Sequence, residues 1–230
     1  IKSRSNYQIR SLLTAREMLV RTRVRIENEL RGLLRTFGVL FSKRVGSFTK
    51  RADEIIAGEL DASPEMRLVA ETLMTARASI LDQIKVLDRR LSAVARATPV
   101  VRLFMTAPGV GVITALSVAS VFDDASRFRR SSSAGAYLGL TPRRYESGET
   151  SRNGRISKQG KELTRKHLYE AATTLLTRNL RFCTLKAWGM KLAKVSGFKK
   201  ARVAVARKLA VILHVMWKTN TPFRWSEVDA

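Results

Sequence analysis

The stretch from residue 63 to 98 constrains the fold most, because it joins a helix start signal to a long, regular apolar repeat. Ser63 followed by Pro64 favours a helix start, since serine caps free amide hydrogens and proline is tolerated in the first turn. The apolar residues then follow a 3.5-residue repeat broken only by Arg77; they are Met66, Ala70, Leu73, Ile80, Ile84, Leu87, Leu91 and Val94. This pattern predicts a coiled coil or, equally, an amphipathic helix packed within its own domain.

A second long helix is predicted from about residue 5 to Gly38, where the glycine favours a stop. Its apolar residues share one stripe; they are Ile9, Leu12, Leu19, Ile26, Leu30, Leu33 and Phe37. The same helix carries Arg10, Arg16, Arg21, Arg23, Arg25, Arg31 and Arg35. Because Glu17 is the only acidic residue before Glu27, this basic face is either a solvated surface or a surface that contacts phosphates.

Pro99 marks a boundary between two regions of the chain. Residues 1–99 are predicted to form a helical linker and coiled-coil region, and residues 100–230 a C-terminal domain. Short helices are predicted in that domain at about 101–107, 111–121, 131–138, 159–178, 182–195 and 199–219, and no convincing strand pattern is present. The predicted fold is therefore mostly α, with a long coiled-coil-like helical arm followed by a compact helical domain that contains a helix-hairpin-helix.

The charge of the chain indicates a polyanionic partner. Forty-three Lys and Arg against nineteen Asp and Glu give a formal net charge of +24, while 45% hydrophobic residues suffice for a folded core. No acidic residue lies between Glu170 and Glu227, where twelve Lys and Arg occur. The longest apolar stretch, 203–217, contains Arg207 and Lys208 and is too short to cross a bilayer. We therefore expect a core helix there, a nucleic-acid partner and no membrane.

The scarcity of cysteine and histidine excludes several kinds of site. Cys183 is the only cysteine, so a disulfide or thiolate cluster cannot form within one chain, and a reducing, cytoplasmic compartment fits best. The only histidines, His167 and His214, exclude a histidine-rich metal site and disfavour a Ser-His-Asp triad. Asp123 and Asp124 are adjacent, but a two-metal nuclease needs several converging carboxylates. A turn is the preferred interpretation, and no metal site is predicted in this chain.

Residues 103–121 show the pattern of a helix-hairpin-helix. An apolar helix end is followed by the turn Pro108-Gly109-Val110-Gly111 and then by a helix of small residues. Glycines let backbone amides approach a phosphate at a helix start, where the helix dipole also favours an anion. We expect Pro108, Gly109 and Gly111 to bind a nucleic-acid backbone regardless of its sequence, with a tight turn between helices as the alternative.

The stretch 141–166 surrounds a serine with positive charge. It holds eight basic and three acidic residues. Gly148 and Gly154 predict a loop, and Ser157 is suited to cap the helix that follows. The residues expected to bind nucleic acid here are Arg143, Arg144, Tyr145, Gly148, Arg155, Lys158, Lys161 and Arg165.

Ser147 is the candidate nucleophile of this stretch. A serine hydroxyl attacks poorly unless a base takes its proton or cations stabilise the charge that develops on the attacked group. Arg143 and Arg144 suit a phosphoryl group, and Glu146 and Glu149 are candidate bases between which spacing does not choose. Two alternatives stay open: the serine is an ordinary loop residue, or the tyrosine two positions earlier is the nucleophile.

Three segments resemble the C-terminal transposase domain of the insertion-sequence one-ten family, which also includes the pilin-gene invertases. They are TAPGVGVITA, FRRSSSAGAYLGLTPRRYESGET and GRISKQGKELTRKHLYEAA, and the resemblance covers about residues 103–175. It implies a DNA recombinase in which Ser147 attacks a DNA phosphate and holds the strand as a covalent phosphoserine during strand exchange. It also implies donor and target DNA, a structured bridge RNA as guide, homo-oligomers assembled through the coiled coil, and a bacterial, nucleoid-associated location.

The same resemblance implies an N-terminal RuvC-like domain whose DEDD carboxylates bind Mg²⁺. That domain is expected to precede residue 1, and the ending TPFRW resembles a complete C-terminus. We therefore expect an N-terminally truncated chain that binds no metal itself and is inactive alone. Two other functions stay open: a non-catalytic nucleic-acid-binding module, or a truncated regulator that dimerises through the helix at 63–98.

Overall fold

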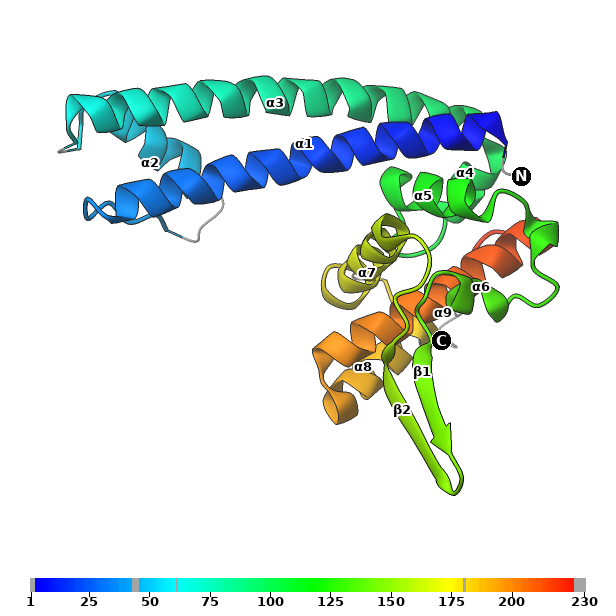
Figure 1. Cartoon of the computed structure of the whole chain (residues 1–230). Helices are drawn as coiled ribbons and strands as arrows, with labels where there is room; N and C mark the ends of the chain where they lie inside the picture. Colours follow the sequence, from blue (N-terminus) through cyan, green and yellow to red (C-terminus); the bar gives the residue numbers. More distant parts are fainter. Residues whose placement is uncertain (1–2, 43–45, 61, 180, 226–230) are drawn as a thin grey trace. The chain divides into compact units, whose positions relative to one another are not determined.

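The structure is a computed structural model that describes residues 3–42, 46–60, 62–179 and 181–225 (Figure 1). These residues are mostly helical, as the sequence predicts. The helices are α1 (Arg4–Arg35), α2 (Ser47–Ile56), α3 (Pro64–Ala97), α4 (Pro99–Phe104), α5 (Val112–Phe122), the 3₁₀ turn η1 (Ala125–Arg127), α6 (Ser133–Tyr137), α7 (Glu162–Thr177), α8 (Thr184–Ser196) and α9 (Phe198–Thr219). The strands are β1 (Pro142–Ser147) and β2 (Thr150–Ile156).

Contacts divide the chain into two compact units. The arm unit is Thr14–Arg90, and the body unit joins the described residues before Thr14 to those from Leu91 onward. The predicted boundary at Pro99 differs from this division, because the first turns of α1 and the last turns of α3 pack in the body unit. Leu13 and Leu91 are buried in its core.

In the arm unit, α1 and α3 run antiparallel and α2 lies on the connection between them (Figure 1). Arg16 pairs with Asp88, and Arg77 pairs with Glu27 at 2.8 Å, which sets the register of the two long helices. The Ser63 cap is confirmed, since its Oγ accepts from the amide of Met66 at 3.4 Å. The core of the unit consists of Leu30, Leu34, Val39, Phe48, Ala52, Ile55 and Ala70.

The first turns of the apolar repeat of α3 are covered by the same chain. Met66 and Leu73 pack against the arm core, which contains Ala70. Arg77, the break in the repeat, meets Glu27 of α1 where both side chains are largely buried, at 15% and 13% exposure. An ion pair at the break shows that this part of α3 is matched to α1. Packing within the domain, one of the two interpretations of the repeat, therefore holds for these turns, and a coiled coil between chains stays a prediction.

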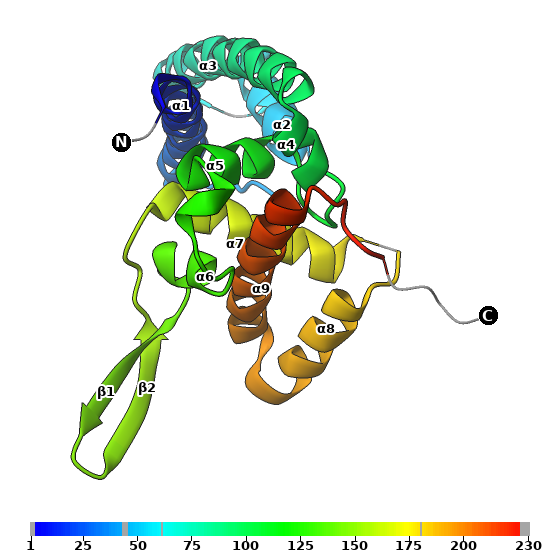
Figure 2. The ribbon, with the colours of Figure 1, turned by 90° about the vertical axis from the view of Figure 1, so that its right-hand side faces the viewer.

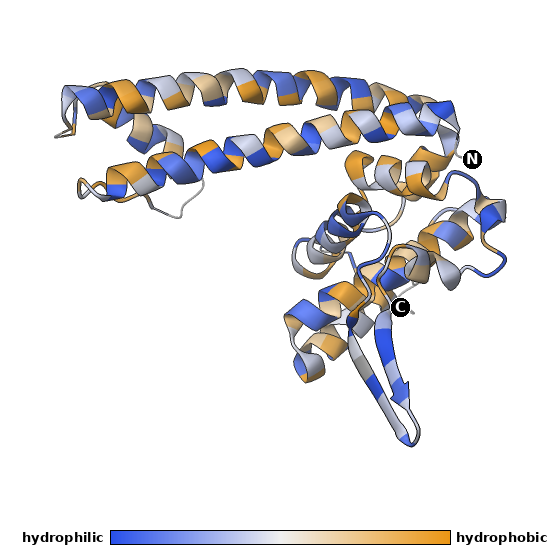
Figure 3. Cartoon of the chain, in the orientation of Figure 1, coloured by the Kyte–Doolittle hydropathy of each residue, from blue (hydrophilic) through white to orange (hydrophobic). Residues whose placement is uncertain are grey.

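The body unit is built around α9, which contacts α4, α6, α7 and α8 (Figure 2). α5 packs on α4 and α7, and its residues from Thr114 to Phe122 are all buried. Hydropathy follows this arrangement, with α5 apolar and the hairpin polar (Figure 3). The stretch 203–217 lies inside α9, which confirms the predicted core helix. Among the described residues, none of the helices has the length and apolar character needed to cross a membrane.

Asp123 and Asp124 lie in the turn after α5, as predicted. Asp124 caps η1 by accepting from the amide of Ser126 at 2.8 Å. Asp123 accepts from the backbone and side chain of Ser3 at 3.1 Å and also from Asn6 Nδ2, so it ties the start of α1 into the body unit. Burial raises the pKa of Asp123, but these hydrogen bonds and a nearby arginine outweigh it and leave the pKa below its ordinary value of 3.8.

Candidate active site

The candidate serine lies on a β-hairpin, where the sequence analysis predicted a loop. β1 and β2 pair antiparallel, with Pro142 opposite Ile156 at the base and Ser147 opposite Thr150 at the tip (Figure 1). The expectation that this region has no strands is therefore wrong. Every residue of β1 is exposed, so the strand shows no alternation of buried and exposed side chains, and alternation is the signal by which a strand is recognised.

Both glycines of the segment serve the hairpin. Gly148 has a φ of 55° and makes a two-residue turn with Glu149, which agrees with the type II′ turns that place glycine first. A Cβ on Gly154 would lie 2.6 Å from Cε2 of Tyr145, so the tyrosine ring covers the glycine across the two strands. The glycines thus support a tight turn and a ring contact instead of an irregular loop.

Ser147 is exposed at the end of β1, directly before the turn. Alternate residues of a strand share a face, and so do directly paired residues. The pairing of Tyr145 with Arg152 therefore places both on the face of Ser147. Glu146 belongs to the opposite face, where its Oε1 lies 3.7 Å from Nη1 of Arg144. Glu146, a candidate base, and Arg144, a candidate phosphate contact, therefore both face away from Ser147.

Within the part of the chain that the structure describes, no hydrogen bond or ion pair joins Ser147 to another side chain. A base for the hydroxyl proton is therefore not assigned to a residue of the hairpin. Tyr145 is 59% exposed and shares the face of Ser147, so it stays a rival nucleophile. The tip is open on all sides of β1, which suits a substrate larger than a small molecule.

The base of the hairpin is fixed to the helical body. The Ser157 amide donates to the carbonyl oxygen of Thr141 at 2.9 Å, and the Lys158 amide donates to that of Gly139 at 3.1 Å. Arg143 Nη2 donates to the Ser157 carbonyl oxygen at 3.2 Å. These hydrogen bonds attach the root of the hairpin to the body, whereas the tip extends beyond them.

Arg165 strengthens this root from α7. Its Nη1 donates to the carbonyl oxygens of Leu138, Gln159 and Gly160 at 3.3, 3.0 and 3.2 Å. Arg165 was predicted to bind nucleic acid, but its guanidinium already holds three carbonyl groups of its own chain. The remaining cations of the predicted set are exposed; they are Arg143, which also bonds to the root, and Arg144, Arg155, Lys158 and Lys161.

The predicted phosphate-binding turn lies between α4 and α5. Pro108 is buried, and Gly109 has a φ of 76° and lies so close to α7 that a Cβ would be 2.3 Å from the carbonyl oxygen of Ala171. Gly111 is exposed at the start of α5, which lacks a side-chain cap. Helix packing therefore accounts for Gly109, in line with the tight-turn alternative, whereas Gly111 leaves a helix start open to solvent.

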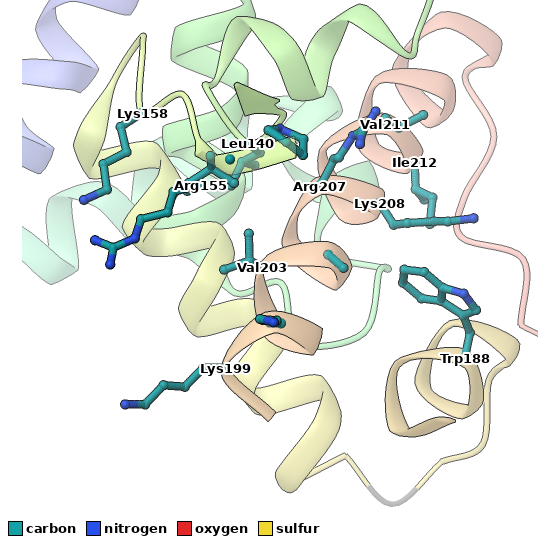
Figure 4. Close-up of a pocket in the computed structure, with 15 residues that line it drawn as sticks. Leu140, Arg155, Lys158, Trp188, Lys199, Val203, Arg207, Lys208, Val211 and Ile212 are labelled. Carbon is teal, nitrogen blue, oxygen red and sulfur yellow. The ribbon is translucent and has the colours of Figure 1, made fainter. Parts of the chain in front are cut away.

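A basic groove lies beside the root of the hairpin (Figure 4). Its volume is about 1260 Å³, and its cations come from two sides: Arg155 and Lys158 from the hairpin and its root, and Lys199, Lys200, Arg207 and Lys208 from α9. The basic character of this part of the chain is evident in the sequence, whereas the grouping of the α9 cations on one groove is not. Spacing in the sequence could have indicated this grouping. Arg207 and Lys208 follow Lys200 by seven and eight residues, which places all three on one face of a helix.

The described residues do not fit a magnesium site. Among them, no group of three or more His, Cys, Asp or Glu side chains gathers closely enough to hold a metal ion. Asp123 and Asp124, the adjacent carboxylates, are engaged in capping. No step of the chemistry below is therefore assigned to a metal held by these residues, and Mg²⁺ in a separate domain stays a prediction.

Comparison with known proteins connects this hairpin to transposases. A family described as Transposase IS116/IS110/IS902 family matches residues 101–185, which run from α4 through the hairpin to the start of α8. The transposase for insertion sequence element IS1111A of Coxiella burnetii is 32% identical over 226 residues, covering 97% of this chain and 62% of the relative. A Pseudomonas aeruginosa protein named "Probable family 20 transposase" is 30% identical over 235 residues, with 97% and 67% covered.

A third relative is the transposase for insertion sequence element IS1328 of Yersinia enterocolitica, which is 27% identical over 214 residues, with 93% of this chain and 64% of the relative covered. These matches place the chain among the transposases. It belongs to the IS116/IS110/IS902 family, as the RRYESG motif and its neighbouring segments indicated. The chain spans 62% to 67% of the length of these three relatives. Ser147 and the whole hairpin lie inside the segment that matches the family.

Proposed function

We propose that this chain carries the nucleophile of a DNA transposase and that Ser147 attacks a phosphodiester of the strand being exchanged. The position of Ser147 supports this most: it is exposed beside the turn of a hairpin whose root is fixed to the body, inside the segment that matches the transposase family. A phosphate in the middle of a long polymer can reach such a tip, whereas it cannot enter a closed pocket. The net charge of +24 provides long-range attraction for DNA.

In the proposed step, Ser147 Oγ forms a bond to phosphorus while the bond from phosphorus to a deoxyribose oxygen breaks. The serine proton passes to a base or to water, and the leaving oxygen takes up a proton and becomes a hydroxyl. The strand is then held as a phosphoserine diester. Attack by the hydroxyl of another strand end breaks the Ser147–phosphorus bond, returns a proton to Oγ and joins the new strand, so no oxidant or nucleotide is consumed.

Arg152 is the cation best placed to assist this step. It shares the face of Ser147 through its pairing with Tyr145, whereas Arg144 belongs to the other face. A guanidinium matches two phosphoryl oxygens geometrically and stabilises the negative charge that develops on them. We assign the phosphoryl contact to Arg152, and contacts with flanking phosphates to Arg144 and to the exposed cations at the hairpin root.

The resemblance to the family also supports a set of partners, which belong to the same proposal. They are donor and target DNA, a structured guide RNA, a carboxylate domain that binds Mg²⁺, and further copies of the chain that meet through the arm unit. The proposed location is the bacterial cytoplasm, at the nucleoid. The DNA, the guide RNA and the carboxylate domain all carry negative charge, which fits the excess of basic residues in this chain.

The covalent intermediate provides the decisive test. The chain is joined to the carboxylate domain of a relative and incubated with guide RNA, Mg²⁺ and labelled donor and target DNA, and protein-linked DNA is sought on a denaturing gel. We expect an adduct that is lost in Ser147→Ala and retained in Tyr145→Phe. Thr150→Ala is a matched control, because it removes the hydroxyl paired directly opposite Ser147 on the same face. An adduct that survives Ser147→Ala would overturn the proposal.

One observation favours a second candidate function. Among the described residues, no side chain hydrogen-bonds to Ser147. An activated serine usually has a base beside it, so this observation also fits a hairpin that binds nucleic acid without reacting with it. A non-catalytic module of this kind predicts bound DNA without an adduct in the assembled complex. A regulator that dimerises with a transposase instead predicts that adding this chain to a relative transposase changes the recombination rate.

A further inference from the structure

The groove beside the hairpin root combines a cationic rim with an apolar floor. Its cations are Arg155, Lys158, Lys199, Lys200, Arg207 and Lys208. Aliphatic side chains of α9, including Val203, Val211 and Ile212, also line the groove, and the Trp188 indole of α8 lies at its far side, next to Lys208 (Figure 4). We propose that this groove binds a single-stranded segment of nucleic acid, with a base stacked on Trp188 and the backbone phosphates held by the α9 cations.

The charge of the groove favours an anionic ligand. Six lining residues are Lys or Arg, and none is Asp or Glu. In the part of the chain that the structure describes, none of these six cations forms an ion pair with a carboxylate. Six like charges around one groove repel each other unless an anion enters. A polyphosphate backbone supplies several anionic groups at regular spacing, so one ligand can contact both walls.

The floor of the groove distinguishes a single strand from a duplex. Trp188 is 38% exposed, and Lys208 Nζ lies 5.0 Å from its ring centroid, so an aromatic surface and a cation stand together. A duplex keeps its bases stacked inside and would leave this apolar floor in contact with water. An unpaired base covers the floor with its flat face, and base stacking on aromatic side chains together with backbone contacts to a positive groove is the usual mode of single-strand binding.

The size of the groove also indicates a polymer. Its volume of about 1260 Å³ exceeds the roughly 300–1,000 Å³ of most small-molecule pockets. An acidic amphipathic helix is the protein ligand that such a groove would accept. A helix buries its apolar stripe on one side, however, and would set few carboxylates against cations that stand on both walls. The observations therefore favour a strand with phosphates along its length.

The groove reaches the hairpin, because Gly154, Arg155 and Ile156 of β2 are among its lining residues. The six residues of β2 from Thr150 to Arg155 extend over about 17 Å. A few nucleotides span this distance. A strand in the groove would thus lie a few nucleotides from the phosphate at Ser147. This positional link rests on the proposed function, whereas strand binding by the groove does not depend on Ser147 being the nucleophile.

The test compares single-stranded and duplex binding in a chain that cannot react. The 230-residue chain with Ser147→Ala is titrated into a labelled oligothymidylate of about 16 nucleotides, and into a duplex of equal length, at fixed salt, and anisotropy is recorded. Trp188→Leu keeps an apolar side chain but removes the stacking surface. We expect it to weaken single-strand binding about 5- to 100-fold and duplex binding less than about twofold.

Matched variants separate the groove from the general charge of the chain. Lys199→Gln with Lys208→Gln removes two groove cations, and Lys191→Gln with Lys194→Gln removes two exposed cations of α8 that do not line the groove. The first pair should lower the slope of log affinity against log salt by about 1.4 for a single strand. The second pair should change it less. Trp225→Leu is the aromatic control, since Trp225 packs on Arg181, outside the groove lining.

Three outcomes would overturn the inference. Single-strand affinity that is unchanged in Trp188→Leu excludes the stacking site. Equal losses for single strand and duplex reduce the groove to a general phosphate surface. Groove variants that bind nucleic acid normally but alter self-association in sedimentation would assign the groove to a second copy of the chain. The adduct experiment and the binding experiment fail separately. If Ser147 proves not to be the nucleophile, strand binding by the groove is still tested, and failure of strand binding leaves the nucleophile proposal standing.

Discussion

The helical body and the β-hairpin of the same unit use glycine for different reasons. In the body, Gly109 lies where a Cβ would meet the carbonyl oxygen of Ala171 at 2.3 Å, while at the hairpin tip Gly148 has nothing within 4 Å. Both have a positive φ, 76° and 55°. Contact with a neighbouring helix, together with the positive φ, therefore requires glycine at position 109, whereas turn geometry alone requires it at position 148. The comparison teaches that substitutions in the body should change stability, and substitutions in the hairpin should change function.

The largest effect is expected for Gly109→Ala. The added methyl group meets the backbone of α7, which cannot move aside without repacking, and alanine also strains the positive φ. We expect a loss of about 3 kcal/mol or more in the free energy of unfolding, measured with urea. Gly111→Ala is the matched control and should lose less than about 1 kcal/mol, because that position is open and has a φ of −94°. A stable Gly109→Ala that has lost DNA affinity would instead support phosphate binding by this turn.

The second effect concerns the two faces of the hairpin. Arg152→Gln and Arg144→Gln each remove one exposed positive charge, but only Arg152 shares the face of Ser147. We expect Arg152→Gln to slow adduct formation about 100-fold, as loss of a group that stabilises developing charge does in other enzymes. Arg144→Gln should slow it less than about 10-fold, with the rate followed on denaturing gels. Similar losses for the two variants would contradict the assignment of Arg152 to the reacting phosphate.

A smaller effect is expected at the tip itself. Gly148→Ala places a side chain in the left-handed region and should weaken the turn by about 1–2 kcal/mol. The hairpin should then open locally while the body keeps its stability, so amide exchange should accelerate in β1 and β2 and stay unchanged in α9. Gly148→Asn should restore most of the protection, because asparagine tolerates this conformation. Loss of global stability in Gly148→Ala would show that the hairpin and body are one cooperative unit.

The smallest effect returns to the body and depends on pH. The pKa of Asp123 is lowered in the folded chain, so its contribution to stability is complete above its ordinary value of 3.8 and is lost as the pH falls through the folded-state pKa. Asp123→Asn should therefore be less stable than the parent at pH 7, and the difference should shrink on acidification. Urea unfolding from about pH 6 to pH 2 measures this. A difference that is constant with pH would show that the carboxylate charge does not anchor Ser3 and Asn6.

Local signals were sufficient for most of the helices. The helix predicted from Ser63 to about Thr98 is α3, and the helix predicted at 199–219 is α9. Caps and apolar periodicity act within a few turns, so they can be identified without the rest of the fold. The turn at Asp123 and Asp124 is also predicted from neighbouring residues, because a metal site would need further carboxylates that converge from elsewhere in the chain.

Only part of the candidate site can be predicted from the sequence. The motif around Ser147 pointed to the right segment, but the strands were missed because all of β1 is exposed and lacks an apolar face. Alternation along β1 places Glu146 on the face opposite Ser147, and the strand pairing places Arg152 on the same face. The face of Arg152 depends on register, and a shift of one residue would reverse it. Arg165 appeared to be a free cation in the sequence, yet it bonds to carbonyl groups at the hairpin root.

The sequence by itself determined the helical class, the positive charge, the family and the serine-bearing motif, because composition, periodicity and motif are properties of neighbouring residues. The tertiary structure alone decided that Gly109 is required by α7, that Arg152 and Ser147 share a face, and that Trp188 lies across a groove from Arg155. The first and third of these relations join residues that are far apart in the chain, and the second depends on how the two strands pair. They arise only when helices and strands pack, because packing and register determine which side chains meet.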